Sequence, residues 1–337
     1  MTDEALRTKI LQQAQGAAAL NVAFIGVANR LFDAVEGETS VADLAAKASV
    51  DAGYLQRWCE AAYAFGYLDE HEGRFSVTDL GRAFRPDTPG TLMPLAIQSV
   101  LGAHMADRAA GFMKTGERPG ESVLAESASI LPWFGPILEA GFGAMFEREI
   151  LPNVAAYRDV DERGGLAVDL GCGNGWYLRK LVRRFPKVRG LGLDGFEENI
   201  RQATERASAE GLGARLTFET GDIYGFGAAE PVDLIAMNRA LHHVWDQRDK
   251  VFAILRDSLR PGGVAVIWEP SWPQGIEALR EPRRRGMAFQ NLSEHVQGNH
   301  FLRPEEIEAA FRGVGMTATT QLFGEGTEAV VVGRREA

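Results

Sequence analysis

The stretch LAVDLGCGNGWYLRKLVRRFP, residues 166–186, joins a run of apolar residues to a helical pattern through three glycines at alternate positions. A glycine turn between a parallel strand and a helix exposes backbone N–H groups and lets a ligand approach with no Cβ in the way. The spacing Gly171-x-Gly173-x-Gly175 differs from the G-x-G-x-x-G of dinucleotide-binding turns. The turn therefore predicts a ligand, and the residues after it have to indicate which one.

Strands and helices alternate from about residue 160 onward. Apolar runs predict strands over 166–170, 189–193, 215–219, 232–237 and 263–268, and helical spacing predicts helices over 176–185, 196–210 and 247–259. This alternation predicts an α/β fold, a doubly wound Rossmann-like domain with a mostly parallel sheet. Ligands of such sheets bind at the carboxyl ends of the strands, so functional residues are expected there.

The first half of the chain has helical patterns instead. Two amphipathic segments within 41–67 precede a hairpin pattern with its turn at Glu72-Gly73, which together predict an α-helical winged-helix domain. Winged helices often bind DNA, but the stretch 51–70 offers only Arg57 as a cation. A structural or dimerisation module is therefore the favoured interpretation.

Three parts are expected along the chain. A winged-helix and dimerisation domain covers 1–95, a helical linker and substrate lid covers 96–155, and the Rossmann-like domain covers 156–337. The middle part carries large apolar side chains between prolines and glycines. Such side chains usually belong to a core, but helices that link two domains can also line a ligand pocket. Candidate acceptor contacts in this part are Trp133, Phe142 and Phe146.

The bulk composition is that of a soluble globular protein, with 337 residues, 45% hydrophobic and 24% charged. A formal charge of −10 disfavours nucleic acid as a partner. There is no run of about 18 uncharged apolar residues. The charged start MTDEALRTKI disfavours a signal peptide, so no membrane segment is expected. Cys59 and Cys172 lie far apart, which predicts neither a disulfide framework nor a metal site and favours a cytoplasmic location.

Acidic residues end three of the predicted strands. Asp194 follows Gly175 by about 20 residues, where a carboxylate can accept hydrogen bonds from both hydroxyls of a ribose. Asp222 ends the third strand and suits the exocyclic amine of an adenine ring. Glu269 ends the fifth strand, after the turn LRPGG. These residue types favour a nucleoside ligand.

The segments VDLGCGNG, LGLD, ETGD and LRDSLRPGGVAVIWE resemble the motif series of class I S-adenosylmethionine-dependent methyltransferases, over about 165–335. With its winged-helix front half, the whole chain resembles the small-molecule O-methyltransferases of plant phenolic and bacterial natural-product pathways. In that subgroup the N-terminal domain forms a homodimer. The resemblance therefore implies S-adenosylmethionine as cofactor, a small-molecule acceptor and a homodimer.

The resemblance also implies a set of cofactor contacts. Asp169 and the glycine turn would face the amino-acid end of the cofactor, Asp194 the ribose, and Asp222 with Ile223 the adenine. The expected cofactor-binding residues are Asp169, Gly171, Gly173, Gly175, Asp194, Gly195, Gly221, Asp222, Ile223 and Asn238. Each aspartate could instead only cap a turn.

The segment MNRALHHVW is similar to the one in which these enzymes place a catalytic histidine, and its register assigns that position to His242. A hydroxyl acceptor has to lose its proton, and histidine titrates in the useful range, so His242 is the candidate general base. Glu269 is the candidate carboxylate that orients it. The phenolic enzymes commonly have Asp-Trp after this histidine, whereas here His243-Val244-Trp245 follows. The alternative is a histidine that only packs beside the cofactor.

Further acceptor contacts are expected at His243, Asn291 and His295. The last two lie in the polar segment NLSEHVQGNHFLRP after the fifth strand, where this fold often has an insertion that covers the acceptor. Such a segment could equally be a solvated surface. A metal-binding role for the histidine pair is the least favoured interpretation, so no metal site is expected.

The leading functional hypothesis is O-methylation of an aromatic or polyketide-like metabolite. An N- or C-methyltransferase of the same build is the nearest alternative, because the cofactor half is common to all three. An enzyme that uses the cofactor without methyl transfer, such as a cyclase or decarboxylase, is a second class. A winged-helix regulator that senses the cofactor is a third, disfavoured by the net negative charge.

Overall fold

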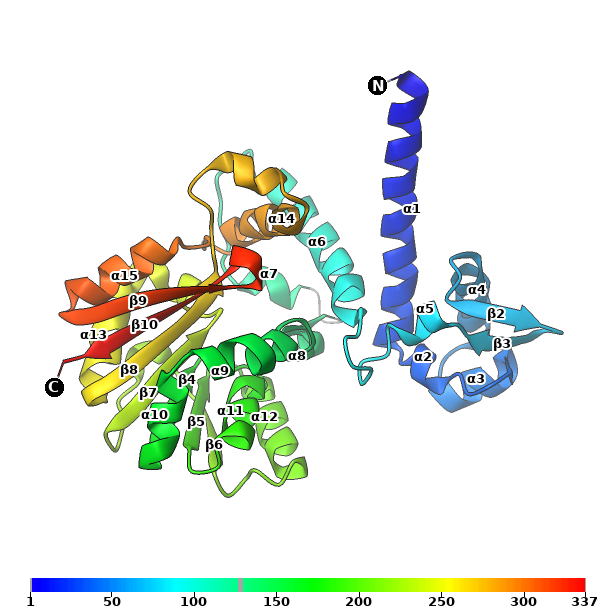
Figure 1. The fold of residues 1–337 in the computed structure, drawn as a ribbon. Helices are drawn as coiled ribbons and strands as arrows, with labels where there is room; N and C mark the ends of the chain where they lie inside the picture. The colour runs from blue at the N-terminus through cyan, green and yellow to red at the C-terminus, as the bar shows by residue number, and fades with distance from the viewer. Residues whose placement is uncertain (1, 127–129, 337) are drawn as a thin grey trace. The chain divides into compact units, whose positions relative to one another are not determined.

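The computed structural model describes residues 2–126 and 130–336, and the chain divides into two compact units (Figure 1). Unit 1 comprises the chain up to Asp107 together with a segment that ends at Gly141. Unit 2 comprises Arg108–Glu126 and the chain from Phe142 onward. The division into 1–95, 96–155 and 156–337 stays a prediction about the roles of these parts.

Unit 1 is mainly helical and carries one small antiparallel sheet, of order β1-β3-β2. Its elements, two of which continue into unit 2, are α1 (Asp3–Ala28), α2 (Leu31–Ala34), β1 (Thr39–Ser40), α3 (Val41–Ala48), α4 (Ala52–Ala64), β2 (Leu68–His71), β3 (Arg74–Val77), α5 (Asp79–Arg82), α6 (Met93–Phe112), η1 (Leu131–Trp133) and α8 (Phe134–Met145).

The helix pair and the hairpin of unit 1 lie where the sequence predicts them. The side chains of Ser40 and Asp51 accept hydrogen bonds from backbone N–H groups in the first turns of α3 and α4, and so define where these helices begin. Glu72 and Gly73 both have positive φ, 48° and 79°, as a two-residue hairpin turn requires. The order helix, helix, hairpin is that of a winged helix.

Helix α1 is 26 residues long and is buried only near its end, at Ala23, Gly26 and Val27. A Cβ at Gly26 would lie 2.4 Å from the ring of Phe32, so this glycine permits close packing. Helix α1 is long and apolar enough to cross a membrane, with a mean hydropathy of 1.2. Core helices of soluble proteins and signal sequences meet the same criteria of length and hydropathy. The expectation that the protein has no membrane segment stays a prediction.

Unit 2 contains the larger sheet and its helices. Its elements are α7 (Ser122–Ala125), the π-helix η2 (Phe146–Ile150), α9 (Leu151–Asn153), α10 (Ala156–Arg163), β4 (Leu166–Leu170), α11 (Trp176–Arg184), β5 (Arg189–Asp194), α12 (Glu197–Ala209), β6 (Leu216–Thr220), η3 (Ile223–Gly225), β7 (Val232–Asn238), η4 (Leu241–Gln247), α13 (Arg248–Ser258), β8 (Leu259–Pro270), η5 (Ile276–Arg280), α14 (Pro282–Val296), α15 (Pro304–Gly313), β9 (Met316–Phe323), η6 (Gly324–Gly326) and β10 (Glu328–Arg335).

The sheet of unit 2 has seven strands in the order β6-β5-β4-β7-β8-β10-β9. Strands β4 to β8 pair in parallel, which confirms the predicted α/β fold. Helices α11 and α12 pack on β4, β5 and β6, while α13 and α15 pack on β8, β9 and β10 (Figure 1). The chain winds outward from β4 in one direction and returns to β7 for the other. The switch point, where a crevice is expected, thus lies between β4 and β7.

The structure differs from the expectation at the far edge of this sheet. Strands β9 and β10 were not predicted, and β10 runs antiparallel to β8 and β9. Strand β8 begins at Leu259 and not at 263. The pairing of β7 with β8 shifts from Val232↔Leu259 to Leu234↔Val264. The residues of the turn LRPGG therefore form a bulge within β8.

Candidate functional site

The glycine turn is held against the neighbouring strand. The backbone N–H groups of Gly171 and Cys172 donate to the carbonyl of Leu193, at 2.8 and 3.0 Å. All three glycines of the turn have positive φ, between 52° and 77°. A Cβ at Gly171 would meet a neighbouring side chain at 2.8 Å and one at Gly175 would do so at 2.6 Å, whereas a Cβ at Gly173 would have no atom within 4 Å. Gly173 therefore faces open space in which a ligand can approach the backbone.

Asp194 ties this turn to the end of β5. Its Oδ2 accepts from the N–H of Gly173 at 2.8 Å, and its Oδ1 accepts from the N–H of Phe196 and from Nδ2 of Asn199, both at 3.0 Å. A carboxylate has about four lone-pair sites, so three are used here. The expected ribose contact of Asp194 stays a prediction, and the structure adds a second task, that of orienting Gly173.

Asp169 and Asn238 meet across the switch point. Nδ2 of Asn238 donates to Oδ1 of Asp169 at 2.9 Å, and Asp169 is almost fully buried. Burial raises the pKa of Asp169 to about 8, because the charged form loses its hydration. The carboxyl is therefore largely protonated at neutral pH in the free protein.

Buried polar atoms at this edge of the sheet lack partners. Within residues 2–126 and 130–336, Oδ1 of Asn238 and both side-chain polar atoms of Asn174 have no hydrogen-bond partner. Each such atom costs about 1–3 kcal/mol unless something binds it. Together with the open space at Gly173, these atoms fit a polar ligand at the carboxyl ends of β4 and β7.

The remaining expected cofactor residues lie beside the end of β6. Asp222 is exposed, and its Oδ1 accepts from the N–H of Tyr224 at 2.9 Å, so it caps η3. Ile223 is half-buried, and Gly221 donates to the carbonyl of Asp194 at 3.0 Å. Gly195 is exposed, with open space where a Cβ would project. Their contacts with a cofactor stay predictions.

His242 and Glu269 form a buried pair. Nδ1 of His242 lies 2.7 Å from Oε2 of Glu269, whose Oε1 accepts from the N–H groups of Leu241 and His242 at 2.8 and 3.3 Å. Burial works to raise the pKa of Glu269, but the charge and hydrogen bond of His242 outweigh it, so the pKa is lowered. A carboxylate at Nδ1 favours the tautomer with its proton on that nitrogen, which leaves a lone pair on Nε2 whenever the ring is neutral.

His243 lies beside this pair. The two imidazole rings are 4.1 Å apart and inclined by 36°. Nδ1 of His243 lies 2.9 Å from Oε1 of Glu121 and also 2.9 Å from Nδ2 of Asn299. Burial works to lower the pKa of His243, but the hydrogen bond with Glu121 and the charges of nearby carboxylates, Glu294 among them, raise it. His243 is thus a polar neighbour of the candidate base.

Three other expected acceptor contacts, Phe146, Asn291 and His295, lie in different surroundings, and their contacts with a substrate stay predictions. Phe146 is fully buried and packs against four aromatic rings, the core position that such large apolar side chains usually have. Asn291 is half-buried and accepts from the N–H of Phe301 at 2.7 Å, which makes it a structural contact. His295 is exposed on α14. Its neighbour Glu294 lies 3.8 Å from Nε2 of His242.

Phe142 and Trp133 lie in different units. Phe142 is half-buried in unit 2, and its ring is covered by the guanidinium of Arg239 at 3.9 Å. Trp133 belongs to unit 1 and packs against the hydrophobic core of that unit. Acceptor contacts by these two side chains stay predictions.

Four residues of interest escaped the sequence analysis. Glu294 lies 3.8 Å from Nε2 of His242, and Glu121 reaches His243 from a segment more than a hundred residues away in sequence. Arg239 has a positive φ of 54° and pairs with Glu328 at 2.6 Å, turning the chain from β7 into η4. Phe196, two residues after Asp194 at the carboxyl end of β5, is a 60% exposed aromatic residue. The position of Phe196 was a readable signal, whereas the two glutamates had none.

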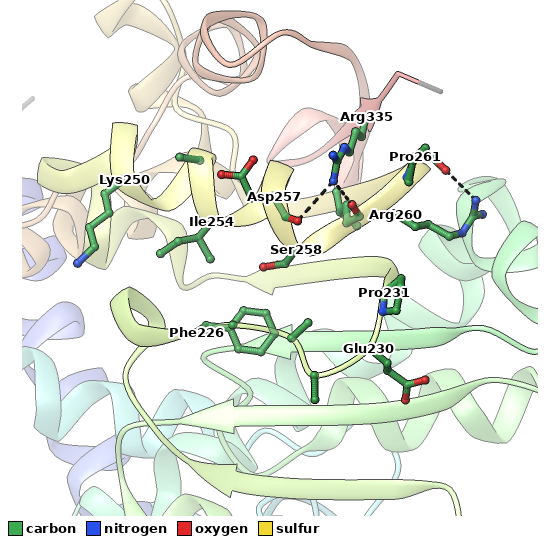
Figure 2. Close-up of a pocket in the computed structure, with 15 residues that line it drawn as sticks. Phe226, Glu230, Pro231, Lys250, Ile254, Asp257, Ser258, Arg260, Pro261 and Arg335 are labelled. Carbon is green, nitrogen blue, oxygen red and sulfur yellow. Dashed lines mark hydrogen bonds between the residues drawn. The ribbon is translucent and has the colours of Figure 1, made fainter.

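The hollow drawn in Figure 2 lies at the amino ends of the strands, opposite to the candidate site. It has a volume of about 660 Å³ and lies between the loop 226–231, α13 and the start of β8 (Figure 2). These segments form the amino ends of β7 and β8, whereas the residues described above lie at the carboxyl ends. The hollow is therefore separate from the candidate site.

Comparisons with known proteins bear on the family and on the fold. Residues 167–263 match the family model described as a methyltransferase domain. The chain is 28% identical over 258 residues to the O-methyltransferase SfmM3 of Streptomyces lavendulae, which is 74% of each chain. The protein is therefore an S-adenosylmethionine-dependent methyltransferase, and its fold is that of class I.

Solved structures share the fold over the full length. The chain is similar to human N-acetylserotonin methyltransferase in complex with SAM, with a TM-score of 0.75 at 18% identity over 100% of this chain and 99% of that one. It is also similar to the mitomycin 7-O-methyltransferase MmcR, with a TM-score of 0.74 at 19% identity over 98% of each chain. At these identities the likeness concerns the fold.

Proposed function

We propose that this protein transfers a methyl group from S-adenosylmethionine to a hydroxyl oxygen of a small aromatic or polyketide-like metabolite, with His242 as the general base. The observation that carries the proposal is the buried pair of His242 and Glu269, at 2.7 Å. The carboxylate holds the ring in one tautomer and stabilises the imidazolium that forms when Nε2 accepts a proton. A neutral amine attacks through its own lone pair, so a methyltransferase that acts on an amine has less need of such a pair.

The cofactor supplies a methyl carbon that is already activated when it binds. The protein then has to position the acceptor, exclude water and take up the hydroxyl proton. In the proposed arrangement Asp169 and the glycine turn hold the amino-acid end, Asp194 holds the ribose, and Asp222 with Ile223 borders the adenine. Nε2 of His242 receives the proton, and Glu269 remains ionised throughout.

Relatives support oxygen as the acceptor atom. SfmM3 and MmcR both carry the name O-methyltransferase. Incubation of the protein with S-adenosylmethionine and a panel of phenols, alcohols, amines and keto acids, read by mass spectrometry, tests the proposal. We expect a methylated product from the hydroxyl compounds. Methylation of the amines or carbon acceptors alone would overturn oxygen as the acceptor.

A further inference from the structure

A group of metal-ligating side chains lies beside the candidate base. One ring nitrogen of His242, one of His243 and one carboxylate oxygen of Glu294 lie within 4.8 Å of one another. Two imidazoles and a carboxylate are a ligand set that Zn²⁺ takes in proteins, with a further position left open. The histidines come from η4 and the glutamate from α14, so two separate elements build the group.

Each imidazole of this group is oriented by a second carboxylate. Nδ1 of His242 lies 2.7 Å from Glu269, and Nδ1 of His243 lies 2.9 Å from Glu121. Metal-binding histidines almost always donate their other ring N–H to such an acceptor, which fixes the tautomer and raises the basicity of the ligand nitrogen. The arrangement thus has both the ligands and the groups that support them.

The distance between His242 and Glu294 fits a shared ion better than a hydrogen bond. Nε2 of His242 lies 3.8 Å from Oε2 of Glu294, which is too long for a hydrogen bond. Two ligands of one tetrahedral zinc ion are about 3.3 Å apart, from bond lengths of about 2.0–2.1 Å. A small movement of the Glu294 side chain, which is 17% exposed, would bring both atoms into range.

Charge also favours a cation at this place. The three carboxylates of Glu121, Glu269 and Glu294 face two imidazoles. Arg239, which acts on Glu269 from a distance, is paired with Glu328 at 2.6 Å. A divalent ion would offset the excess negative charge. Mg²⁺ and Ca²⁺ prefer oxygen ligands throughout, so the two imidazoles select a transition metal of the zinc type.

We propose that Nε2 of His242, a ring nitrogen of His243 and the carboxylate of Glu294 bind one divalent transition-metal ion such as Zn²⁺. Glu269 and Glu121 orient the two rings. The ion occupies the lone pair with which His242 would accept the acceptor's proton, so it inhibits methyl transfer. This inhibition rests on the proposed function, whereas the binding does not.

Cobalt binding tests the site without reference to activity. The full chain is freed of metal with a chelator and titrated with Co²⁺, and the visible absorption of the bound ion is followed, with Zn²⁺ as competitor. We expect saturation at one ion per chain and displacement by Zn²⁺. Glu294→Gln and His243→Ala should each weaken binding by about tenfold or more. His295→Ala, beside Glu294 on α14, is the matched control and should bind as the original chain does.

Circular dichroism and thermal melting establish that each variant is folded, so a loss of binding can be assigned to the site. A chain that fails to take up Co²⁺, or variants that bind it as tightly as the original, would overturn the metal site. In a separate arm, Zn²⁺ is added to the methyl-transfer assay of the unmodified chain. Metal binding without inhibition of methyl transfer would contradict the proposal that the ion occupies the lone pair of the base, His242. Absence of any methyl transfer would count against the proposed function and leave the Co²⁺ result unaffected.

Discussion

The chemistry of the site depends on a few charged residues that the fold has removed from water. Glu269 is fully buried, yet it receives two backbone N–H groups and the ring of His242, which together keep it ionised. A buried carboxylate with these partners is able to hold an imidazole in one tautomer and to stabilise its protonated form. The base proposed here therefore depends on Glu269 as much as on His242.

Replacement of the base has a defined kinetic signature. His242→Ala is expected to lower kcat by roughly 10²–10⁴-fold with cofactor affinity unchanged, because only the proton acceptor is removed. Glu269→Gln should shift the pH profile of kcat as well, since the amide does not stabilise the imidazolium. Steady-state kinetics on a hydroxyl acceptor, with calorimetry for the cofactor, measure both effects. A loss of less than tenfold in His242→Ala would reduce this residue to a packing role.

The pH dependence of stability reports on Asp169. Its pKa in the folded chain is about 8, against 3.8 for an exposed aspartate, so the folded state holds this proton more tightly than the unfolded state does. The stabilisation is complete below about pH 4 and is lost as the pH rises through 8, by at most about 1.4 kcal/mol per pH unit. Urea unfolding at several pH values in this window should show the decline in the original chain and a shallower one in Asp169→Asn. Parallel curves would contradict the assignment.

At the scale of elements, two glycines of the same turn are needed for different reasons: Gly175 for folding and Gly173 for binding of the cofactor. Gly173 and Gly175 both have positive φ, so an alanine at either position costs about 1–2 kcal/mol in backbone strain. A Cβ at Gly175 also meets the ring of Phe218 at 2.6 Å, whereas one at Gly173 meets nothing.

Gly175→Ala should therefore lower the melting temperature markedly, while Gly173→Ala should lower it slightly and weaken binding of S-adenosylmethionine. Thermal melting and calorimetry on the two variants separate these effects. Equal cofactor affinity in Gly173→Ala and the original chain would show that the cofactor does not approach this backbone.

Elements near the glycine turn could be predicted from the sequence to within a residue or two. Strand β7 and helices α11 to α13 follow the apolar periodicity closely because buried parallel strands and their covering helices both have strong patterns. Strand β9 was missed, since MTATTQLF mixes polar and apolar residues at an edge of the sheet, whereas β10 was missed although EAVVVGRR contains an apolar run. His242 and Glu269 were predicted together because both follow parallel strands, which end at one edge. The approach of Glu121 and Glu294 depends on the path of segments between the strands, which no local pattern encodes.

At the scale of the whole molecule, the homodimer is a proposal that the exposed face of α1 makes testable. Leu6, Ile10 and Leu11 are between 44% and 62% exposed on this helix. Apolar side chains repeated along one exposed helix are typical of a surface that another chain covers. We expect light scattering to give twice the chain mass, and the double substitution Ile10→Glu with Leu11→Glu to give the single mass. A monomeric original chain would contradict the proposal.

The measurement that tests the central claim most directly is calorimetric titration of S-adenosylmethionine into the original chain, Asp194→Ala and Asp257→Ala. Asp194 holds Gly173 at the carboxyl ends of the strands, whereas Asp257 borders the hollow at their amino ends. Removal of Asp194 should cost on the order of 2–4 kcal/mol of binding free energy, from the hydrogen bond that its remaining lone pair can accept and from the release of Gly173, and removal of Asp257 should cost nothing. Full affinity in Asp194→Ala, or a loss confined to Asp257→Ala, would contradict a cofactor site between β4 and β7.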